Sequence, residues 1–266
     1  MKIIISALLI LISTTVDASS FKALELPKSQ FLTELPTITI ALPSSYAADT
    51  TKAYPVLYLL DGELNGELVE GMLTRLNLSN GANEHIIVGI TSRDRLRDFA
   101  PTINKDPRGP VGAGGGGDKF LDFIEKELIP QVNKTYRTNR FNVVAGHSIA
   151  GLLVIHSFQS RPQLFQGHLA FSPAVWWGAR ETAKATQKYI TSKQPIKNYL
   201  YMNIGSEGGE MREVYDSLSQ TIQRNRNLDL ELRLNEFNDD PHDFTMAAGL
   251  FNALSGLYQY QQQHGM

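Results

Sequence analysis

Apolar residues follow two different spacings along the chain. Continuous apolar runs that end in turn residues are typical of buried strands, whereas alternation with polar residues is typical of strands with one exposed face. Together these patterns predict strands at residues 37–43, 54–60, 84–90, 141–146, 167–172, 199–205 and 230–237. The last of them alternates, as LELRLNEF, and is therefore expected nearer an edge of the sheet.

Segments between and after these strands predict helices at residues 118–132, 149–158, 211–225 and 244–260. All of them except 149–158 are amphipathic. Asp118 is placed as the N-cap of the first helix. The helix at 149–158 is apolar nearly all round, so we expect it to be buried. The repeated alternation of strand and helix indicates one α/β domain, with a mostly parallel central sheet flanked by helices.

The first residues have the pattern of an export signal. A basic residue, Lys2, precedes the apolar run 3–12, which is shorter than the roughly 20 residues that a membrane-spanning helix needs. Residues 16–18 (VDA) then offer small side chains at the spacing that signal peptidase reads. We therefore predict a signal peptide at 1–18 and a periplasmic or secreted domain at 19–266, with no membrane insertion after cleavage. A buried N-terminal strand or a retained anchor is the alternative.

Composition narrows the chemistry further. The chain has no cysteine among its 266 residues, which excludes disulfides, thiolate nucleophiles and thiolate metal sites. Its formal net charge is −2, without the basic excess that a nucleic-acid partner usually requires. The chain must therefore be stabilised by its own apolar core, which this length permits.

One serine stands where a strand is expected to turn into a buried helix. In GHSIAG, Ser148 lies between Gly146 and Ala150, and residues this small are needed when a serine occupies a sharp, strained turn. This context favours Ser148 as a nucleophile. The alternative is an ordinary serine that caps a helix in a glycine-rich turn.

A serine nucleophile needs a base, and on this architecture the acid and then the histidine follow it along the chain. His242 lies in a polar loop between the last strand and the last helix, where the base is expected. Glu207 follows the strand at 199–205 at its first turn and is our candidate acid. Glu210 is the alternative acid, and a Ser-His dyad without an acid stays open.

Two backbone N–H groups are expected to form an oxyanion hole. One belongs to Ile149, directly after the serine, and the other to Glu63, in the loop after the strand at 54–60. We expect no cofactor and no metal. The acidic cluster around His242 lacks a second nearby histidine, and the glycine-rich segment 108–120 lacks the Gly-Lys-Ser/Thr of a P-loop, so it is interpreted as a mobile loop near a substrate cleft.

Four further residues are candidates for the wall of a substrate pocket. Trp176 and Trp177 follow a strand on the edge where ligands bind in open α/β sheets, and Arg97 lies in a loop on the same edge. His147 adjoins Ser148, and its side chain is expected to point away from the serine.

Several motifs together resemble an esterase family of the α/β-hydrolases. The motifs are PVLYLLDG, IIVGI, RLRDFAPT, GGGGDKFLDFIEKELIPQV, GHSIAG, FSPAVWW and GSEGGE, and the resemblance covers roughly residues 37–260. The family includes esterase D (S-formylglutathione hydrolase), enterochelin-type siderophore esterases, feruloyl esterase domains and mycolyltransferases. Relatives commonly have Gly-Gly where this chain has Ala150 and Gly151.

The resemblance implies an α/β-hydrolase fold and specific roles. Ser148 matches the family nucleophile, His242 its late histidine and Glu207 its usual acid position. Glu63 matches the place of the first oxyanion N–H.

The leading hypothesis is a serine esterase acting on a small-molecule ester, in the manner of a siderophore esterase. An acyltransferase and a feruloyl or acetyl sugar esterase at the same site are alternatives. A non-catalytic envelope binding protein is the alternative of another class. The sequence leaves the oligomeric state open.

Overall fold

The computed structural model describes residues 20–107, 109–192 and 194–265. The predicted signal peptide at 1–18 lies outside the described residues. Eight strands form one sheet in the order β1-β2-β4-β3-β5-β6-β7-β8. Their bounds are Lys22–Ala23, Thr37–Ala41, Tyr54–Leu60, Ile86–Thr91, Thr138–His147, Gly167–Phe171, Tyr199–Ile204 and Glu231–Glu236.

The sheet is mostly parallel, as predicted. Strands β3 to β8 run parallel to their neighbours, whereas β2 pairs antiparallel with β4, and β1 with β2. All seven predicted strands are present, and β8 lies at an edge of the sheet. The carboxyl ends of the parallel strands therefore share one side of the molecule, where loops from distant parts of the sequence meet.

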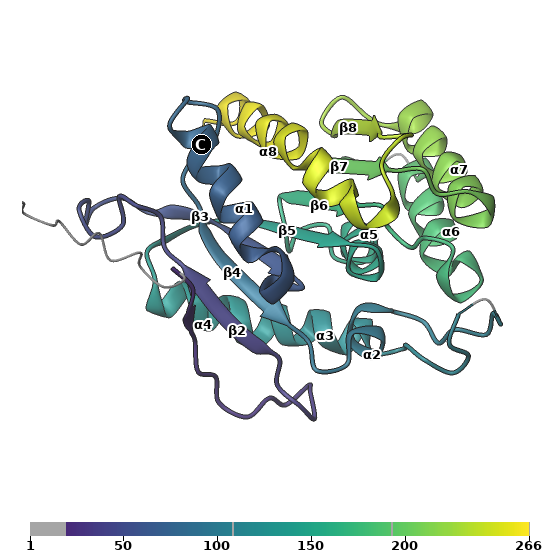
Figure 1. Cartoon of the computed structure of the whole chain (residues 1–266), viewed down its shortest axis with the longest axis horizontal. Coiled ribbons are helices and arrows are strands. Elements are labelled where there is room, and N and C mark those ends of the chain that lie inside the picture. Colours follow the sequence, from purple (N-terminus) through teal and green to yellow (C-terminus); the bar gives the residue numbers. More distant parts are fainter. Residues whose placement is uncertain (1–19, 108, 193, 266) are drawn as a thin grey trace, which may run out of the picture.

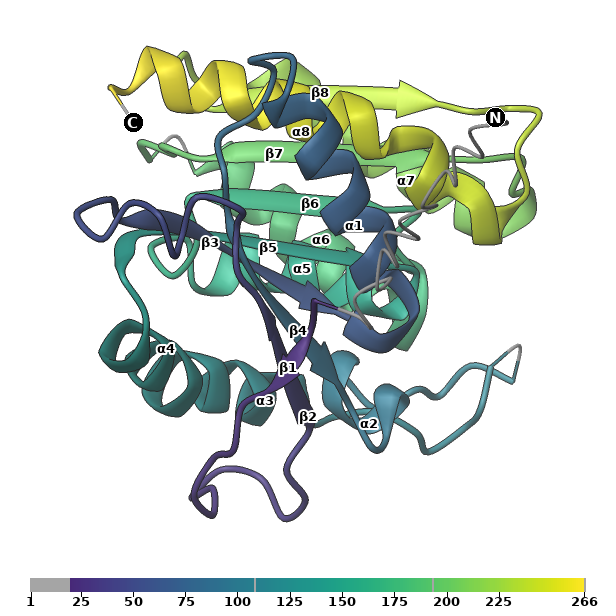
Figure 2. The same ribbon diagram turned by 60° about the vertical axis from the view of Figure 1, so that its left-hand side comes forward.

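Helices cover both faces of the sheet (Figures 1 and 2). Their bounds are Gly62–Asn77 (α1), Arg95–Phe99 (α2), Gly117–Phe123 (α3), Ile129–Thr135 (α4), Ile149–Ser160 (α5), Trp177–Thr191 (α6), Gly209–Asn225 (α7) and Thr245–Gln263 (α8). A π-helical turn, Ile124–Leu128, joins α3 to α4, and a 3-10 turn, His242–Phe244, precedes α8. Within the described residues no helix combines the length and the apolar character that spanning a membrane requires.

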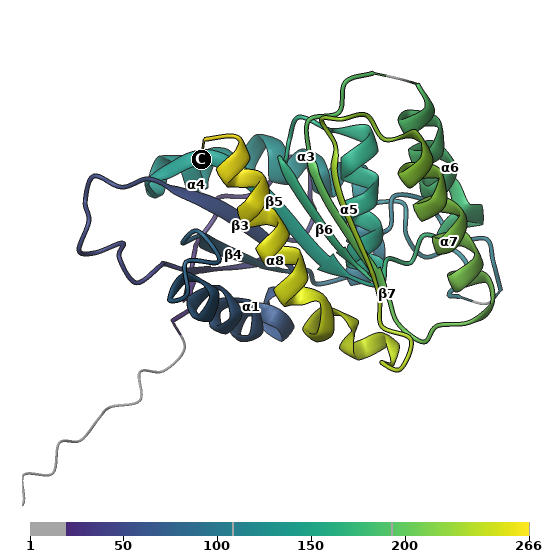
Figure 3. The ribbon, with the colours of Figure 1, turned by 90° about the horizontal axis from the view of Figure 1, so that it is seen from above.

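Alternate residues of the strands feed two separate apolar cores. Leu57 and Leu59 of β3 pack in the core under α1 and α8, whereas Tyr58 and Leu60 pack in the core under α3 to α7. Figure 3 shows α1 and α8 on one side of the sheet and α5 to α7 on the other. This period of two is what a strand buried on both faces requires.

The prediction for Asp118 is wrong in one detail. The helix begins one residue earlier, at Gly117, and its N-cap is Gly116. The Asp118 carboxylate instead lies 2.8 Å from Nε2 of His156 on α5. A glycine fits the cap position because a Cβ on Gly116 would lie 2.6 Å from the Arg97 carbonyl oxygen.

A pair of glycines sets how closely α1 approaches the sheet. A Cβ on Gly62 would lie 2.5 Å from the Cα of Gly89 in β4. Asp61, which precedes α1, adopts the left-handed conformation (φ 56°, ψ 46°) that turns the chain off β3 into the helix. The start of α1 is therefore held against the carboxyl end of the neighbouring strand.

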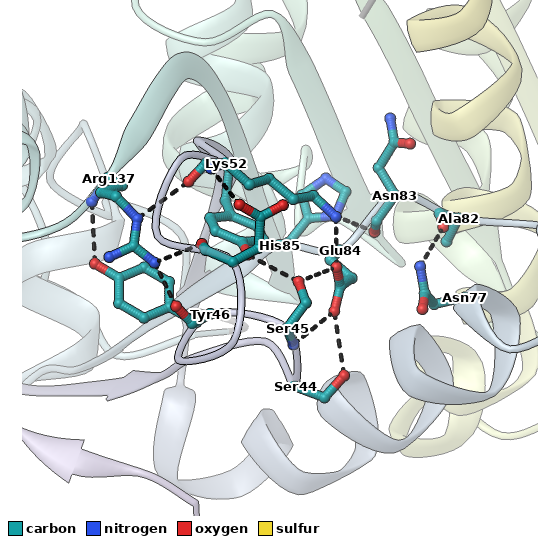
Figure 4. A network of polar contacts seen from close by, with 12 residues as sticks. Ser44, Ser45, Tyr46, Lys52, Asn77, Ala82, Asn83, Glu84, His85 and Arg137 are labelled. Carbon is teal, nitrogen blue, oxygen red and sulfur yellow. Dashed lines mark hydrogen bonds and ion pairs between the residues drawn. The ribbon is translucent and has the colours of Figure 1, made fainter.

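A polar network around Glu84 closes the opposite side of the molecule, where the parallel strands begin (Figure 4). The Glu84 carboxylate accepts hydrogen bonds from Ser44, from both the N–H and the hydroxyl of Ser45, and from Lys52 at 2.6 Å. Burial alone would raise the pKa of Glu84, but the bonds from Lys52 and Ser45 lower it to about 2. The network thus ties the β2–β3 connection to the start of β4.

This network predicts a pH dependence of stability. Because the pKa of Glu84 is lower in the folded protein than in the unfolded chain, the stabilisation is complete above the unfolded pKa of 4.5 and is lost as the pH falls toward 2. We expect Glu84→Gln to lower the free energy of unfolding at pH 7 by about 1–2 kcal/mol and to flatten its pH dependence in this range. Urea denaturation between pH 7 and pH 3 measures both effects. Glu67→Gln, on the exposed face of α1, is the control, and an equal change in that variant would contradict the assignment.

Candidate active site

Ser148 lies on a sharp turn between β5 and α5. Its backbone is in an uncommon left-handed region (φ 60°, ψ −117°). The Ser148 N–H donates to the Phe171 carbonyl at 2.9 Å, and the Ser148 carbonyl accepts from Ala174 at 3.0 Å. A Cβ on Gly146 would lie 2.8 Å from backbone atoms of Ala150, so the turn depends on this glycine. This backbone is the one expected of a nucleophile elbow.

The two expected oxyanion donors differ in their surroundings. Ile149 is the first residue of α5, where backbone N–H groups lack acceptors within the helix. The Glu63 N–H donates to the hydroxyl of Thr91 at 3.1 Å. A substrate oxygen at Glu63 would therefore share this donor with the threonine or displace the hydroxyl.

His242 and Glu207 are in direct contact. Nδ1 of His242 lies 2.6 Å from Oε1 of Glu207. Because a carboxylate only accepts, Nδ1 carries the proton and Nε2 is left without one in the neutral ring. Glu210 instead pairs with Arg180, at 2.5 Å. Of the two acids that the sequence offered, Glu207 is the one bonded to the histidine.

Glu207 is held by several donors at once. Its side chain is 8% exposed. Oε1 also accepts from the Ser172 hydroxyl, and Oε2 accepts from the Gly205 N–H at 2.6 Å. Burial alone would raise the pKa of Glu207, but the bonds from Ser172 and His242 lower it below its ordinary value. The carboxylate is thus charged at neutral pH, as required to stabilise an adjacent imidazolium.

Ser172 and Asn203 are site residues that the sequence did not single out. The Ser172 N–H donates to Oδ1 of the fully buried Asn203 at 2.9 Å. The Asn203 amide in turn donates to the Thr245 carbonyl at 2.7 Å, and the Thr245 hydroxyl donates to the His242 carbonyl at 2.9 Å. Asn203 therefore connects Ser172, which binds Glu207, to the turn that contains His242. Only its place on a buried strand, where polar side chains are uncommon, could have indicated this role.

His147 contacts His242 directly. Nε2 of His147 lies 2.9 Å from the His242 carbonyl oxygen, and the two rings are 4.5 Å apart between centroids. Burial, and to a lesser extent the nearby His242, lower the pKa of His147 to about 4. His147 is therefore a neutral ring beside the candidate base.

Arg95, rather than Arg97, adjoins the candidate nucleophile. Nε of Arg95 donates to both Asp61 carboxylate oxygens at 2.9 Å, and Nη2 donates to the His147 carbonyl at 2.9 Å. Arg97 is bound by Asp98 at 2.7 Å and by Glu34 at 3.2 Å, and it lies in the short helix α2 rather than in the loop that the sequence indicated. The two arginines are alike in the sequence and differ only in their partners.

The tryptophan pair supports the loop that follows α2. The indole N–H of Trp177 donates to the Thr102 carbonyl at 2.8 Å, and this side chain is only 3% exposed. A Cβ on Gly109 would lie 3.3 Å from the partly buried Trp176. Trp177 is thus a buried anchor, and Trp176 presents the more accessible of the two rings.

The glycine-rich segment is tied to its surroundings through its own amides. The N–H groups of Gly115 and Gly117 donate to the Ala100 carbonyl, and that of Gly116 donates to the Arg97 carbonyl. Nearer the tip of the loop, the Asn104 side-chain amide donates to the carbonyls of Asp106 and Pro110. Across the described part of the chain, no group of three or more His, Asp or Glu side chains is arranged to hold a metal ion.

Comparison with known proteins identifies similar sequences of one family. Residues 29–253 match the family model described as "Putative esterase". The ferri-bacillibactin esterase BesA of Bacillus subtilis is 32% identical over 181 residues, covering 62% of this chain and 62% of BesA. The siderophore triacetylfusarinine C esterase of Aspergillus fumigatus is 32% identical over 152 residues, covering 53% of this chain and 51% of that protein. The chain thus spans about half to three fifths of these curated relatives.

The fold has a counterpart among solved structures. An IroE-like serine hydrolase from Shewanella oneidensis superposes with a TM-score of 0.84 at 27% sequence identity, covering 90% of this chain and 80% of that protein. This likeness confirms the predicted α/β-hydrolase fold. Because the family model also extends over most of the sequence, the chain belongs to this esterase family.

Proposed function

We propose that the protein is a serine hydrolase that cleaves carboxylic esters through Ser148, His242 and Glu207. The observation that carries the proposal is the 2.6 Å contact between Nδ1 of His242 and Glu207. The turn that contains His242 is also hydrogen-bonded to His147, the residue before Ser148. The left-handed backbone of Ser148 supports the nucleophile assignment, and membership of the esterase family supports the reaction class.

The proposed reaction proceeds through an acyl-enzyme. Nε2 of His242 takes the Ser148 proton as the serine oxygen attacks the ester carbonyl. Glu207 stabilises the resulting imidazolium without taking its proton. The N–H groups of Ile149 and Glu63 stabilise the tetrahedral oxyanion. His242 then protonates the leaving alcohol, and water releases the acyl group from Ser148.

The names of the relatives suggest the substrate. Both curated relatives described above are named as esterases of siderophores or their iron complexes. We propose an ester or lactone bond of a siderophore as the substrate. With the signal peptide predicted from the sequence, hydrolysis would take place in the periplasm or outside the cell.

The nucleophile assignment is tested by substitution. We expect Ser148→Ala to lower kcat on p-nitrophenyl butyrate by at least about 10³-fold, because the attacking oxygen is removed. Wild type should be labelled by a fluorophosphonate probe, and the variant should not. Ser160→Ala, at the exposed end of the same helix, is the matched control and should keep its activity. Full activity in Ser148→Ala would exclude the mechanism.

The acid assignment distinguishes two neighbouring glutamates. We expect Glu207→Gln to lower kcat by about 10²- to 10⁴-fold, because a neutral amide cannot stabilise the imidazolium. Glu210→Gln should stay within a few-fold of wild type, since its carboxylate pairs with Arg180. Steady-state kinetics at pH 7 measures both. A loss of only a few-fold in Glu207→Gln would instead indicate a dyad.

The substrate assignment is tested by comparing ester classes. We expect kcat/KM to be highest for a siderophore lactone, and at least about 10-fold lower for a feruloyl sugar and for p-nitrophenyl acetate. Adding an acceptor alcohol separates hydrolysis from acyl transfer, because transfer yields a new ester. A preference for the feruloyl sugar, or ester formation that outcompetes hydrolysis, would count against a siderophore esterase.

A further inference from the structure

Four loops at the carboxyl side of the sheet meet at His147. Its carbonyl accepts from Arg95, which follows β4 and also binds Asp61, the residue that follows β3. Its side chain contacts His242, in the connection between β8 and α8. His147 itself ends β5 and is the residue before Ser148. His147 therefore contacts Arg95 and His242 directly, and Arg95 extends this chain of contacts to Asp61.

The side-chain bond of His147 has a defined direction. A carbonyl oxygen can only accept, so Nε2 of His147 carries the proton in its 2.9 Å contact with His242. This proton is committed to the carbonyl, so in the neutral ring of His147 the nitrogen without a proton is Nδ1. The Thr245 hydroxyl donates to the same carbonyl at 2.9 Å. The carbonyl of His242, in the short 3-10 turn, is thus bonded by two side chains: His147, far earlier in the sequence, and Thr245, three residues later.

The ring of His147 also limits the movement of the His242 imidazole. The two rings lie 4.5 Å apart at an interplanar angle of 45°. Glu207 holds Nδ1 of the same imidazole. The backbone carbonyl, Nδ1 and the ring of His242 are therefore each in contact with a neighbour. None of these contacts uses Nε2.

The charge state of His147 suits this arrangement. The groups that affect its titration are His242, Arg95 and Asp243, and the ring is largely buried. Burial and the charges of His242 and Arg95 lower the pKa of His147, whereas the bond to the His242 carbonyl and the charge of Asp243 raise it by less. A neutral ring at this position does not oppose the imidazolium that His242 becomes during the reaction.

We infer that His147 is a positioning residue for the catalytic base, fixing the distance and orientation of His242 relative to Ser148 through its Nε2–H bond and ring contact. This role extends the proposed function, on which it rests, and it is separate from the expectation that His147 lines a substrate pocket. It differs from the roles of Glu207 and Ser148, because His147 need not touch the substrate.

Two substitutions separate the contacts of His147. His147→Phe keeps a ring but loses the donor, whereas the side-chain amide of His147→Gln can still donate to the His242 carbonyl. We expect His147→Phe to lower kcat by about 10- to 100-fold, as for a displaced catalytic group, with KM within about two-fold of wild type. His147→Gln should recover most of the lost kcat. His156→Gln, another histidine in contact with a neighbouring helix, is the control and should resemble wild type.

Comparing esters with different leaving groups distinguishes positioning of His242 from a merely structural role of His147. His242 must protonate an alkoxide leaving group, whereas p-nitrophenolate leaves without a proton. The loss in His147→Phe should therefore be larger on ethyl butyrate than on p-nitrophenyl butyrate. Thermal unfolding of each variant shows whether it is folded, and kcat is compared among the folded variants.

The outcomes separate this inference from the proposed function. If Ser148→Ala is inactive but His147→Phe keeps kcat within two-fold, the positioning role is wrong and the esterase mechanism stands. Equal losses on the two butyrate esters, or a His147→Gln variant as impaired as His147→Phe, also overturn the positioning role. If Ser148→Ala keeps full activity, the proposed mechanism itself fails.

Discussion

The close approach of β5 to α5 at Gly146 is the constraint on which the site depends. A side chain at this position would collide with the backbone of Ala150, so strand and helix can meet at this distance only around a glycine. The approach forces Ser148 into a left-handed backbone that an L-residue adopts at a cost. Hydrogen bonds to Phe171 and from Ala174 hold the strained turn in place. The strain is therefore balanced by the neighbouring strand β6 and the loop that follows it.

The same physical logic governs the acid. Glu207 is nearly buried, and burial by itself favours the neutral form of a carboxyl group. Bonds from Ser172 and His242 reverse this preference and hold the pKa of Glu207 below its ordinary value, and the Gly205 N–H binds the other carboxylate oxygen. These donors also fix the carboxylate geometrically, so the charge is available to His242 without rearrangement during a reaction. Preorganisation of this kind is what makes a buried carboxylate effective beside a histidine.

The sequence indicated the architecture more fully than the partners within the site. Strand periodicity located every strand but the two-residue β1, because burial on one or both faces leaves a direct mark on residue order. Helix α1 was not identified. It starts at Gly62, where a glycine is needed because the helix packs closely against Gly89, and a glycine does not by itself indicate the start of a helix. Helix α6 was not identified either, and it opens with left-handed backbone at Gly178, Ala179 and Arg180, which no helical periodicity predicts.

Within the site, the choices that stayed open were between chemically identical neighbours. Glu207 and Glu210 occupy one polar turn, and only the direction of each side chain decides which reaches His242 and which reaches Arg180. Such directions depend on tertiary contacts that local sequence does not encode.

The convergence of loops at His147 also has a consequence for how the protein acquires activity. His147 and His242 are separated by 95 positions in the sequence, and Arg95 and Asp61 join them from two earlier strands. Contacts between such distant segments carry the loop-closure entropy of the chain between them, so they form more slowly than contacts within a helix. A partly folded chain can contain the serine turn without containing a working site. Catalytic activity therefore reports assembly of the parallel part of the sheet, β3 to β8, more strictly than helix content does.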